Sequence, residues 1–374
     1  MTPVYLQRGA LCSALGADLP AAALALRSGE RPRPGQFVLH ELQQARPYLN
    51  ALGSVAGETL ERRLDRLLHE TLGDGSQELD DCLLIVASTG LDIAAREVQV
   101  AAEQGFRRDE HSTPLDTLAG ELRQRWGFAE AFTLNTACTS AANGLIYGAR
   151  LVASGQFRRV LVLAFETPSA LAMQGFGALD LTSRSARYRP FHPERDGLIL
   201  GETYSCALLG LEPGDAPLAR LLGGFSACDT SSLTSTREDG SHIDAVMRAA
   251  LHSAGRDASE IDLVKLHGTA TSANDNAESN GTRSLFGAAM PALCVLKPWL
   301  GHTLGACGLS ETLLLIEALR QGQLPAADYA EDAILPLAAE PFGTVDDLLL
   351  ANFFGFGGNN ASLVLQACRA GEQP

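Results

Sequence analysis

The sequence predicts an α/β protein with a parallel sheet. Short apolar, strand-like runs alternate with helical stretches along the 374-residue chain, which is the pattern of such folds. The chain also resembles itself: a strand, then small residues, then an apolar helix ending in Gly-Gln occurs twice. In these two copies, Gln156 comes 18 positions after Cys138 and Gln323 comes 18 positions after Gly305. We interpret the repeat as an ancient duplication.

The predicted strands are spread over both copies. They are DDCLLIVAS (80–88), AFTLN (131–135), RRVLVLAFE (158–166), TYSCALLGLE (203–212), DLVKLHGT (262–269) and DDLLLANFF (346–354). The turn-rich segment LEPGDAP, at 211–217, is the best boundary between the copies. We therefore expect an N-terminal half at 1–213 and a C-terminal half at 214–374.

Composition indicates an ordinary globular protein. The 46% hydrophobic content can fill a large core, and no apolar run approaches the roughly 20 residues of a membrane helix. The first residues lack the layout of a secretory signal, so we expect a cytoplasmic protein. Eight scattered cysteines indicate reduced thiols without a metal site. The net charge of −15 argues against nucleic acid and anionic membranes as partners.

One segment carries a local cluster of positive charge. Residues 58–72, ETLERRLDRLLHETL, have leucines at core-facing helical spacing and place Arg62, Arg63 and Arg66 on the same helix. Two interpretations stay open: a docking surface for an acidic partner, or a solvated helix face with Glu–Arg pairs.

Lysine use is unusual in this chain. Of 29 basic residues, only Lys265 and Lys297 are lysine, and Lys297 lies five residues before His302 in a glycine-rich stretch. A lysine among so many arginines suggests that this position needs the compact ammonium charge of lysine rather than the planar guanidinium group of arginine. Chance is the alternative interpretation.

Four side chains at turn-like positions could share one pocket. Cys138 follows a strand and precedes a helical run, where amide N–H groups and the helix dipole would favour a thiolate nucleophile. His267 ends an apolar strand, where it could act as a base or a hydrogen-bond donor. Each residue alone is more often structural, but Cys138, His267, Lys297 and His302 together indicate a catalytic site.

Five ordered motifs resemble those of the β-ketoacyl-acyl-carrier-protein synthases of the elongating Cys-His-His type, in the thiolase superfamily. These motifs are TACTSAANG around Cys138, YRPFHPERDGLILGE at 188–202, HGTATSANDNAES at 267–279, LKPWLGHTLGACGLSE at 296–311 and NFFGFGGNNASLVL at 352–365. The resemblance implies a thiolase-like fold with α-β-α-β-α layers. It also implies a decarboxylative condensation of malonyl carrier protein with a cysteine-bound acyl group.

The same resemblance implies the residue roles. Cys138 would be the acylated nucleophile, and His267 and His302 would stabilise the developing enolate oxygen. Lys297 would lie behind the histidines and pair with Glu311, and Phe356 would supply an oxyanion-hole amide and a gate. Thr269, Thr271 and Phe354 would bind the phosphopantetheine arm. No metal or separate organic cofactor is implied.

The resemblance also implies partners. These are acyl- and malonyl-loaded carrier proteins, and a homodimer or a heterodimer with a related ketosynthase subunit. Carrier proteins are acidic, which makes Arg62, Arg63 and Arg66 candidates for docking.

Several positions depart from the family pattern without removing a reacting group. Ser272, Thr203 and Asn359 replace the usual proline, glycine and threonine, which suggests a specialised fatty-acid, polyketide or polyene branch. Two alternatives remain. One is a non-condensing partner like the chain-length factors, although those typically lose the cysteine. The other is a thiolase-type acyltransferase with a second catalytic cysteine, for which Cys307 is the only nearby thiol; we interpret Cys307 as a packing substitution.

Overall fold

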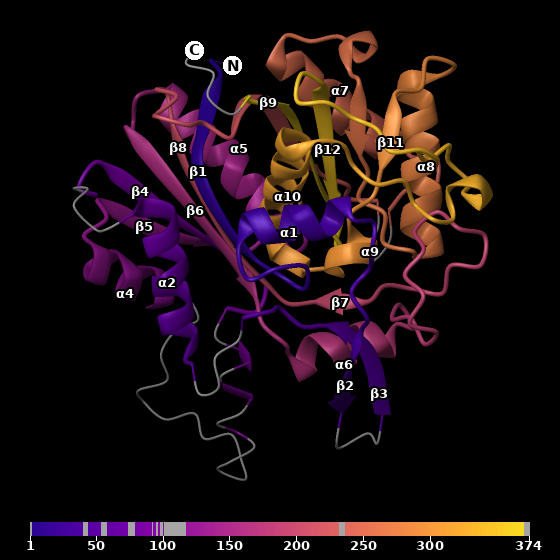
Figure 1. The fold of residues 1–374 in the computed structure, drawn as a ribbon, viewed down its shortest axis with the longest axis horizontal. Coiled ribbons are helices and arrows are strands. Elements are labelled where there is room, and N and C mark those ends of the chain that lie inside the picture. The colour runs from indigo at the N-terminus through magenta and orange to yellow at the C-terminus, as the bar shows by residue number, and fades with distance from the viewer. Residues whose placement is uncertain are drawn as a thin grey trace.

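The computed structural model describes residues 2–39, 44–53, 58–73, 79–91, 93–94, 96–97, 100, 117–231 and 236–369. Figure 1 shows a large central sheet covered by helices, with a small sheet beside it. The strands are β1 (Val4–Cys12), β2 (Gly35–Leu39), β3 (Gln44–Leu49), β4 (Cys82–Ala87), β5 (Glu130–Leu134), β6 (Arg159–Glu166), β7 (Leu200–Gly201), β8 (Thr203–Gly210), β9 (Ala219–Cys228), β10 (Leu263–Lys265), β11 (Ala292–Cys294), β12 (Leu348–Phe354) and β13 (Asn359–Ala367). The helices are α1 (Leu19–Arg27), α2 (Leu60–Leu72), α4 (Thr117–Trp126), α5 (Ser140–Ala153), α6 (Ala170–Ala178), α7 (Ser241–Ala254), α8 (Ser272–Phe286), α9 (Lys297–Leu300) and α10 (Cys307–Gln321).

The two halves have the same strand topology. The ten-stranded sheet runs β11-β10-β12-β13-β9-β1-β8-β6-β4-β5, so each half contributes five adjacent strands. In each half the second strand pairs in parallel with the third and the fourth, and the fifth pairs antiparallel with the fourth and the first. The sheet is therefore mixed, and the prediction of a parallel sheet is wrong for the strands next to the junction of the two halves. The identical topology of the two halves confirms the duplication that the sequence predicts.

The helices form three layers around the two half-sheets. Helices α2 and α4 pack with β4, β6 and β8 on the outer face of the N-terminal half. Helices α7 and α8 cover the outer face of the C-terminal half, while α5 and α10 contact strands of both halves and lie between them (Figure 1). The order α-β-α-β-α is therefore the predicted one.

Strand sequences explain how both faces of each half are buried. In β4, for example, Leu83 and Ile85 face the central helices, whereas Leu84 and Val86 face the outer layer. Because alternate side chains of a strand point to opposite faces, a strand buried on both sides must be apolar throughout. This is why the continuous apolar runs of the sequence identify these strands correctly.

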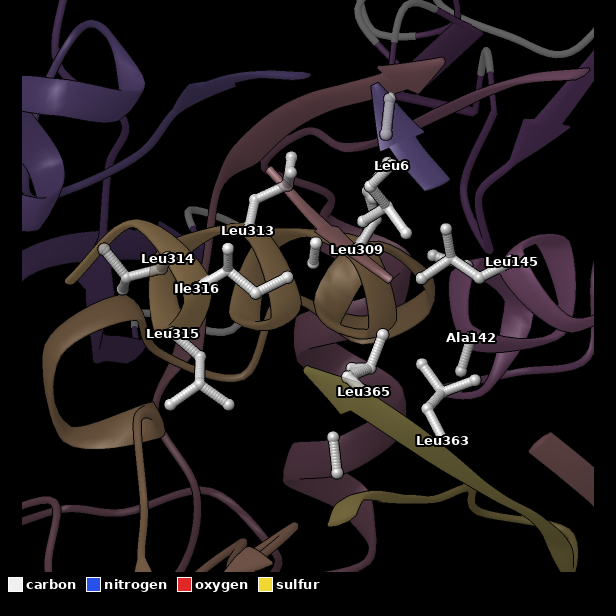
Figure 2. Packing of buried hydrophobic residues seen from close by; sticks show 14 of the residues in the cluster. Leu6, Ala142, Leu145, Leu309, Leu313, Leu314, Leu315, Ile316, Leu363 and Leu365 are labelled. Atoms are coloured by element: carbon white, nitrogen blue, oxygen red, sulfur yellow. The ribbon is translucent and has the colours of Figure 1, made fainter. Parts of the chain in front are cut away.

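The central layer is a dense apolar cluster. Figure 2 shows side chains of α10, α5, β1 and β13 meeting there, among them Leu313, Leu145, Leu6 and Leu363. Helices α5 and α10 approach closely because Gly308 lies against the start of α5, where any Cβ would overlap the Ala142 amide. The small residues of both repeated motifs thus have a packing function as well as a place near the site.

The predicted boundary lies in the connection between β8 and β9. The two halves nevertheless share one sheet, since Val4–Leu6 of β1 pair with Ala219–Leu221 of β9. Among the described residues, no helix is both long enough and apolar enough to cross a membrane.

The helix contact generates a stability prediction. We expect Gly308→Ala to lower the midpoint of urea unfolding by an amount equivalent to about 1–3 kcal/mol, because the added methyl group overpacks the α5–α10 contact. Gly120→Ala is the matched control: Gly120 is on α4 with no atom within 4 Å of a new Cβ, so it should stabilise by about 0.5–1 kcal/mol. Equal effects of both substitutions would contradict this account.

Candidate active site

The proposed nucleophile lies at the junction between β5 and α5. Cys138 comes two residues before α5 begins and follows Ala137, whose φ of 52° turns the chain sharply into the helix. The Ser140 hydroxyl donates to the Ala137 carbonyl and accepts from the Thr136 amide at 2.9 Å, which stabilises the turn. Cys138 is 3% exposed, so its thiol is reached only through a pocket.

The two histidines come together as the sequence predicts. His267 follows β10 and His302 follows α9, and their ring centroids are 5.4 Å apart in an edge-to-face arrangement. Lys297 Nζ lies 3.2 Å from His267 Nδ1. Because an ammonium group has only donors, His267 Nδ1 must accept and its proton must be on Nε2. Within the described part of the chain, His267 Nε2 has no hydrogen-bond partner, so it is available to a ligand.

A fully buried ion cluster supports these histidines. Lys297 Nζ donates to Glu311 Oε1 at 2.6 Å, as expected from the family resemblance. Lys265, to which the sequence assigned no role, donates to Glu311 Oε2 at 2.6 Å. Both lysines of the chain therefore share one carboxylate. The signal was available in the sequence, because a lysine inside an apolar strand requires a buried partner.

Two carboxylates on α8 position the loop that carries His267. Glu278 accepts from the His267 and Gly268 amides at 2.6 and 2.9 Å. Asp275 accepts from the Thr269 amide at 3.0 Å and from the Phe191 amide at 2.7 Å. Burial raises the pKa of Glu278 to about 7 and that of Asp275 to about 6. The acidic positions of the 267–279 motif thus stabilise backbone rather than contact substrate.

One pocket collects most of the predicted site residues. The residues predicted from the sequence that line it are Cys138, His267, Thr269, Thr271, His302, Phe354 and Phe356. The hydroxyl groups of Thr269 and Thr271 are 2.8 Å apart, and Phe176 packs edge-on against Phe356 at 6.0 Å. Lys297 and Glu311 do not line this pocket; they lie behind it, without exposed surface.

The environment of the thiol corrects one expectation. Burial raises the pKa of Cys138, so the helix start does not give a thiolate in this resting structure. The amide of Phe356, the charge of Lys297 and the amide of Cys138 itself act in the opposite direction and lower that pKa. The Phe356 amide is the one expected to contribute to an oxyanion hole, and it and the Cys138 amide both lie at the sulfur.

Glu166 is a site residue that the sequence analysis missed. It ends β6 and accepts from the amide and hydroxyl of Thr89, from the Gly90 amide and, at 3.1 Å, from the Gly305 amide. Burial raises its pKa to about 7. Glu166 therefore joins a loop of the N-terminal half to the turn after His302. Its signal was a single carboxylate at the end of an otherwise apolar strand.

Cys307 is buried outside the pocket. It is the first residue of α10, and its thiol donates to the Cys138 carbonyl oxygen at 3.0 Å. Because its sulfur does not line the pocket, this position agrees with a packing role and not with a second catalytic cysteine.

The arginines of α2 require a correction. Arg63 is 8% exposed and forms ion pairs with Glu58 at 3.2 Å and Glu202 at 3.1 Å, so a docking role for Arg63 is wrong. Arg62 and Arg66 are exposed, and their docking role stays a prediction.

Two protein-family models match this chain, one in each half. The model of the β-ketoacyl synthase N-terminal domain matches residues 75–212, and that of the C-terminal domain matches residues 218–328.

Curated relatives match most of this chain and most of their own length at moderate identity. 3-Oxoacyl-[acyl-carrier-protein] synthase 2 of Vibrio cholerae is 28% identical over 347 residues, covering 82% of this chain and 83% of the relative. The protein of the same name from Vibrio harveyi is 28% identical over 343 residues, with 82% and 83% covered.

Solved structures agree with the fold. A chain of the ApeO ketosynthase–ApeC chain length factor complex from Xenorhabdus doucetiae superposes with a TM-score of 0.84 at 25% identity, covering 98% of both chains. A β-ketoacyl synthase from Burkholderia phymatum superposes with a TM-score of 0.82 at 24% identity, covering 99% of this chain and 100% of that one. Family models and fold agree with the five sequence motifs, and the chain belongs to the β-ketoacyl synthase family.

Proposed function

We propose that this protein is a condensing β-ketoacyl-acyl-carrier-protein synthase. The observation that carries the proposal is the single pocket in which Cys138 meets His267 and His302, with Lys297 donating to the inner nitrogen of His267. A nucleophile and two imidazole donors around one space fit acyl transfer followed by decarboxylation.

The first half-reaction acylates the cysteine. The Cys138 sulfur attacks the thioester carbon of an acyl carrier protein, the carbon–sulfur bond to the pantetheine arm breaks, and the arm leaves as a free thiol with one proton. The amides of Cys138 and Phe356 lie at the sulfur, where they can stabilise charge on the tetrahedral oxygen. Thr269 and Thr271 offer hydroxyl groups at the pocket wall for the arm.

The second half-reaction forms the carbon–carbon bond. Malonyl carrier protein loses CO₂ by cleavage of its carbon–carboxylate bond, which leaves an enolate. His267 donates to the enolate oxygen through Nε2, and His302 supplies the second donor. The enolate carbon then attacks the Cys138 thioester, and the Cys138 sulfur leaves to give the 3-ketoacyl product. The proposed reaction uses no metal or organic cofactor beyond the pantetheine arm.

The proposed partners are carrier proteins and a second ketosynthase-type subunit. Strand β5 is an edge of the ten-stranded sheet and exposes Phe132, which leaves an edge for pairing with such a subunit. None of the eight cysteines, all of which lie in the described part of the chain, forms a disulfide, which supports a reducing compartment such as the cytoplasm. Because the solved relatives include complexes with chain length factors, we propose a specialised fatty-acid, polyketide or polyene pathway.

The proposal predicts a covalent intermediate. Incubation with a panel of acyl carrier proteins should add one acyl group to the wild-type chain and none to Cys138→Ala, as measured by intact-mass spectrometry. Malonyl carrier protein should then discharge the adduct as a 3-ketoacyl product. No adduct with any donor, even after addition of a related synthase subunit, would instead indicate a chain-length-factor-like subunit.

The raised pKa of Cys138 predicts how its reactivity depends on pH. Since the thiolate is the nucleophile, alkylation of Cys138 by iodoacetamide should accelerate through the alkaline range and not level off near neutral pH. Lys297→Met removes a charge that lowers this pKa, so alkylation at a given pH should become slower. Peptide mapping follows both rates, with the exposed Cys228 as internal control. A neutral-pH plateau for Cys138 would contradict the burial effect.

The α2 arginines give a separable test of docking. An ion pair between an exposed arginine and an acidic carrier protein contributes about 0.5–1 kcal/mol to the free energy of binding. Arg62→Glu should therefore raise the KM for carrier protein roughly two- to fivefold at low salt. Arg63→Met should instead lower the free energy of unfolding by about 1–3 kcal/mol, because Glu58 and Glu202 both lose the guanidinium, although Glu58 keeps Arg66 and Glu202 keeps the Tyr204 hydroxyl. Arg256→Glu, on the C-terminal half, controls for net charge. An unchanged KM for Arg62→Glu would remove α2 from the docking surface.

A further inference from the structure

Lys265 is the charged residue that the proposed mechanism leaves without a role. It ends β10, two residues before His267, and its side chain has no exposed surface. Its ammonium lies 2.6 Å from Glu311 Oε2 and 3.6 Å from the centre of the Phe353 ring. Leu263, two residues earlier, faces the central helix layer, so strand alternation directs Lys265 toward α10 as well.

The charge of the cluster is not balanced. Lys297 alone would neutralise Glu311, and the pair would be complete at a distance of 2.6 Å. Lys265 adds a second cation to the same carboxylate, so the cluster carries one net positive charge when all three groups are ionised. Burying an excess charge costs several kcal/mol in general. Burial accordingly lowers the pKa of Lys265, while the Glu311 carboxylate acts to raise it. A purely structural role is an inefficient explanation of that cost.

The excess charge lies directly behind His267. The groups that face this imidazole are Lys297 at Nδ1, the His302 ring at its edge and the Phe354 ring at 6.0 Å. Glu278 binds the His267 backbone amide and not the ring. On the pocket side the neighbour is the neutral Cys138 thiol. No described carboxylate contacts the imidazole, so the nearest charges behind the ring are those of the cluster.

We propose that Lys265 is a positioning residue that keeps His267 neutral and donating through Nε2. Lys265 binds the second oxygen of Glu311 and so gives the cluster a net positive charge. Lys297 can then direct one of its protons at His267 Nδ1. The direction of the pKa agrees, since burial and then the charges of Lys297, His302 and Lys265 hold the pKa of His267 well below its usual value. A neutral donor suits the proposed enolate, because a neutral imidazole N–H stabilises the oxygen charge by a hydrogen bond but is too weak an acid to transfer its proton to the enolate.

The test is a charge-balance series on the full chain. Lys265→Met removes one positive charge with little change in side-chain length, so the cluster becomes neutral. Lys265→Met combined with Glu311→Gln restores the single positive charge and leaves no buried carboxylate unpaired. Nitrogen-15 histidine NMR reports the protonation state and tautomer of His267, which is assigned by comparison with His267→Asn. This readout does not require turnover.

We expect wild-type His267 to stay neutral with its proton on Nε2 from pH 5.5 to 8. Lys265→Met should move its titration midpoint upward, and the double variant should move it back toward wild type. The acid limb of malonyl-thioester decarboxylation should shift in the same order. If Lys265 had only a structural role, Lys265→Met combined with Glu311→Gln would move the titration midpoint and the acid limb further from wild type than Lys265→Met alone.

The result that would overturn the proposal is an unchanged midpoint in Lys265→Met or a further upward shift in the double variant. If Lys265→Met fails to fold, Lys265→Gln removes the same charge while keeping a donor for Glu311, and an unchanged midpoint in that variant overturns the proposal. A cationic wild-type His267 or a proton on Nδ1 at pH 7 overturns it as well. The inference rests on the proposed function only for its activity readout. A wild-type protein that shows the neutral tautomer but no decarboxylation would contradict the proposed function and leave the role of Lys265 standing.

Discussion

The arrangement of the site depends on one buried carboxylate, Glu311. Its two oxygens each accept from a different lysine at 2.6 Å, and one of those lysines reaches His267. Because these charges have no access to water, they are stabilised by one another and by the Phe353 ring and the His267 nitrogen that the two lysines contact. The cluster links β10, α9 and α10, so three elements of the C-terminal half must be in register before His267 and His302 can face one pocket.

The sequence predicted this half of the site well because its chemistry is local. Short segments predict the strand before His267, the turn around His302 and the small residues that let α10 pack closely. The structure brings these features together as expected. The duplication was also visible, since both copies need small residues where α5 and α10 meet. Lys265 was recognisable in the sequence as a buried lysine that needs a partner, but its partner could not be identified, because Glu311 lies 46 positions away.

Two expectations failed for a common physical reason, which is burial. Cys138 lies at a helix start as predicted, but desolvation of the sulfur outweighs the favourable amides and the charge of Lys297. Arg63 lies three residues after Leu60 and four before Leu67, beside the apolar stripe of the helix, and its guanidinium packs over the Tyr204 ring between two carboxylates. Periodicity reports the face of a helix, whereas the depth of a side chain depends on segments far away in the chain. Glu166 was missed for the same reason.

The duplicated architecture explains why one pocket can combine two kinds of chemistry. In each half a buried carboxylate holds the backbone after the second strand: Glu166 holds Thr89 and Gly90, and Glu278 holds His267 and Gly268. In the N-terminal copy the carboxylate holds a loop close to Cys138. In the C-terminal copy it holds the loop that carries the donor His267. Glu166 also accepts from the Gly305 amide in the other half, so the two copies are tied at the site itself. The duplicated fold therefore fixes how the two halves approach each other. The loops of the N-terminal half supply the thiol, and the C-terminal half supplies the two imidazoles and the cationic cluster behind them.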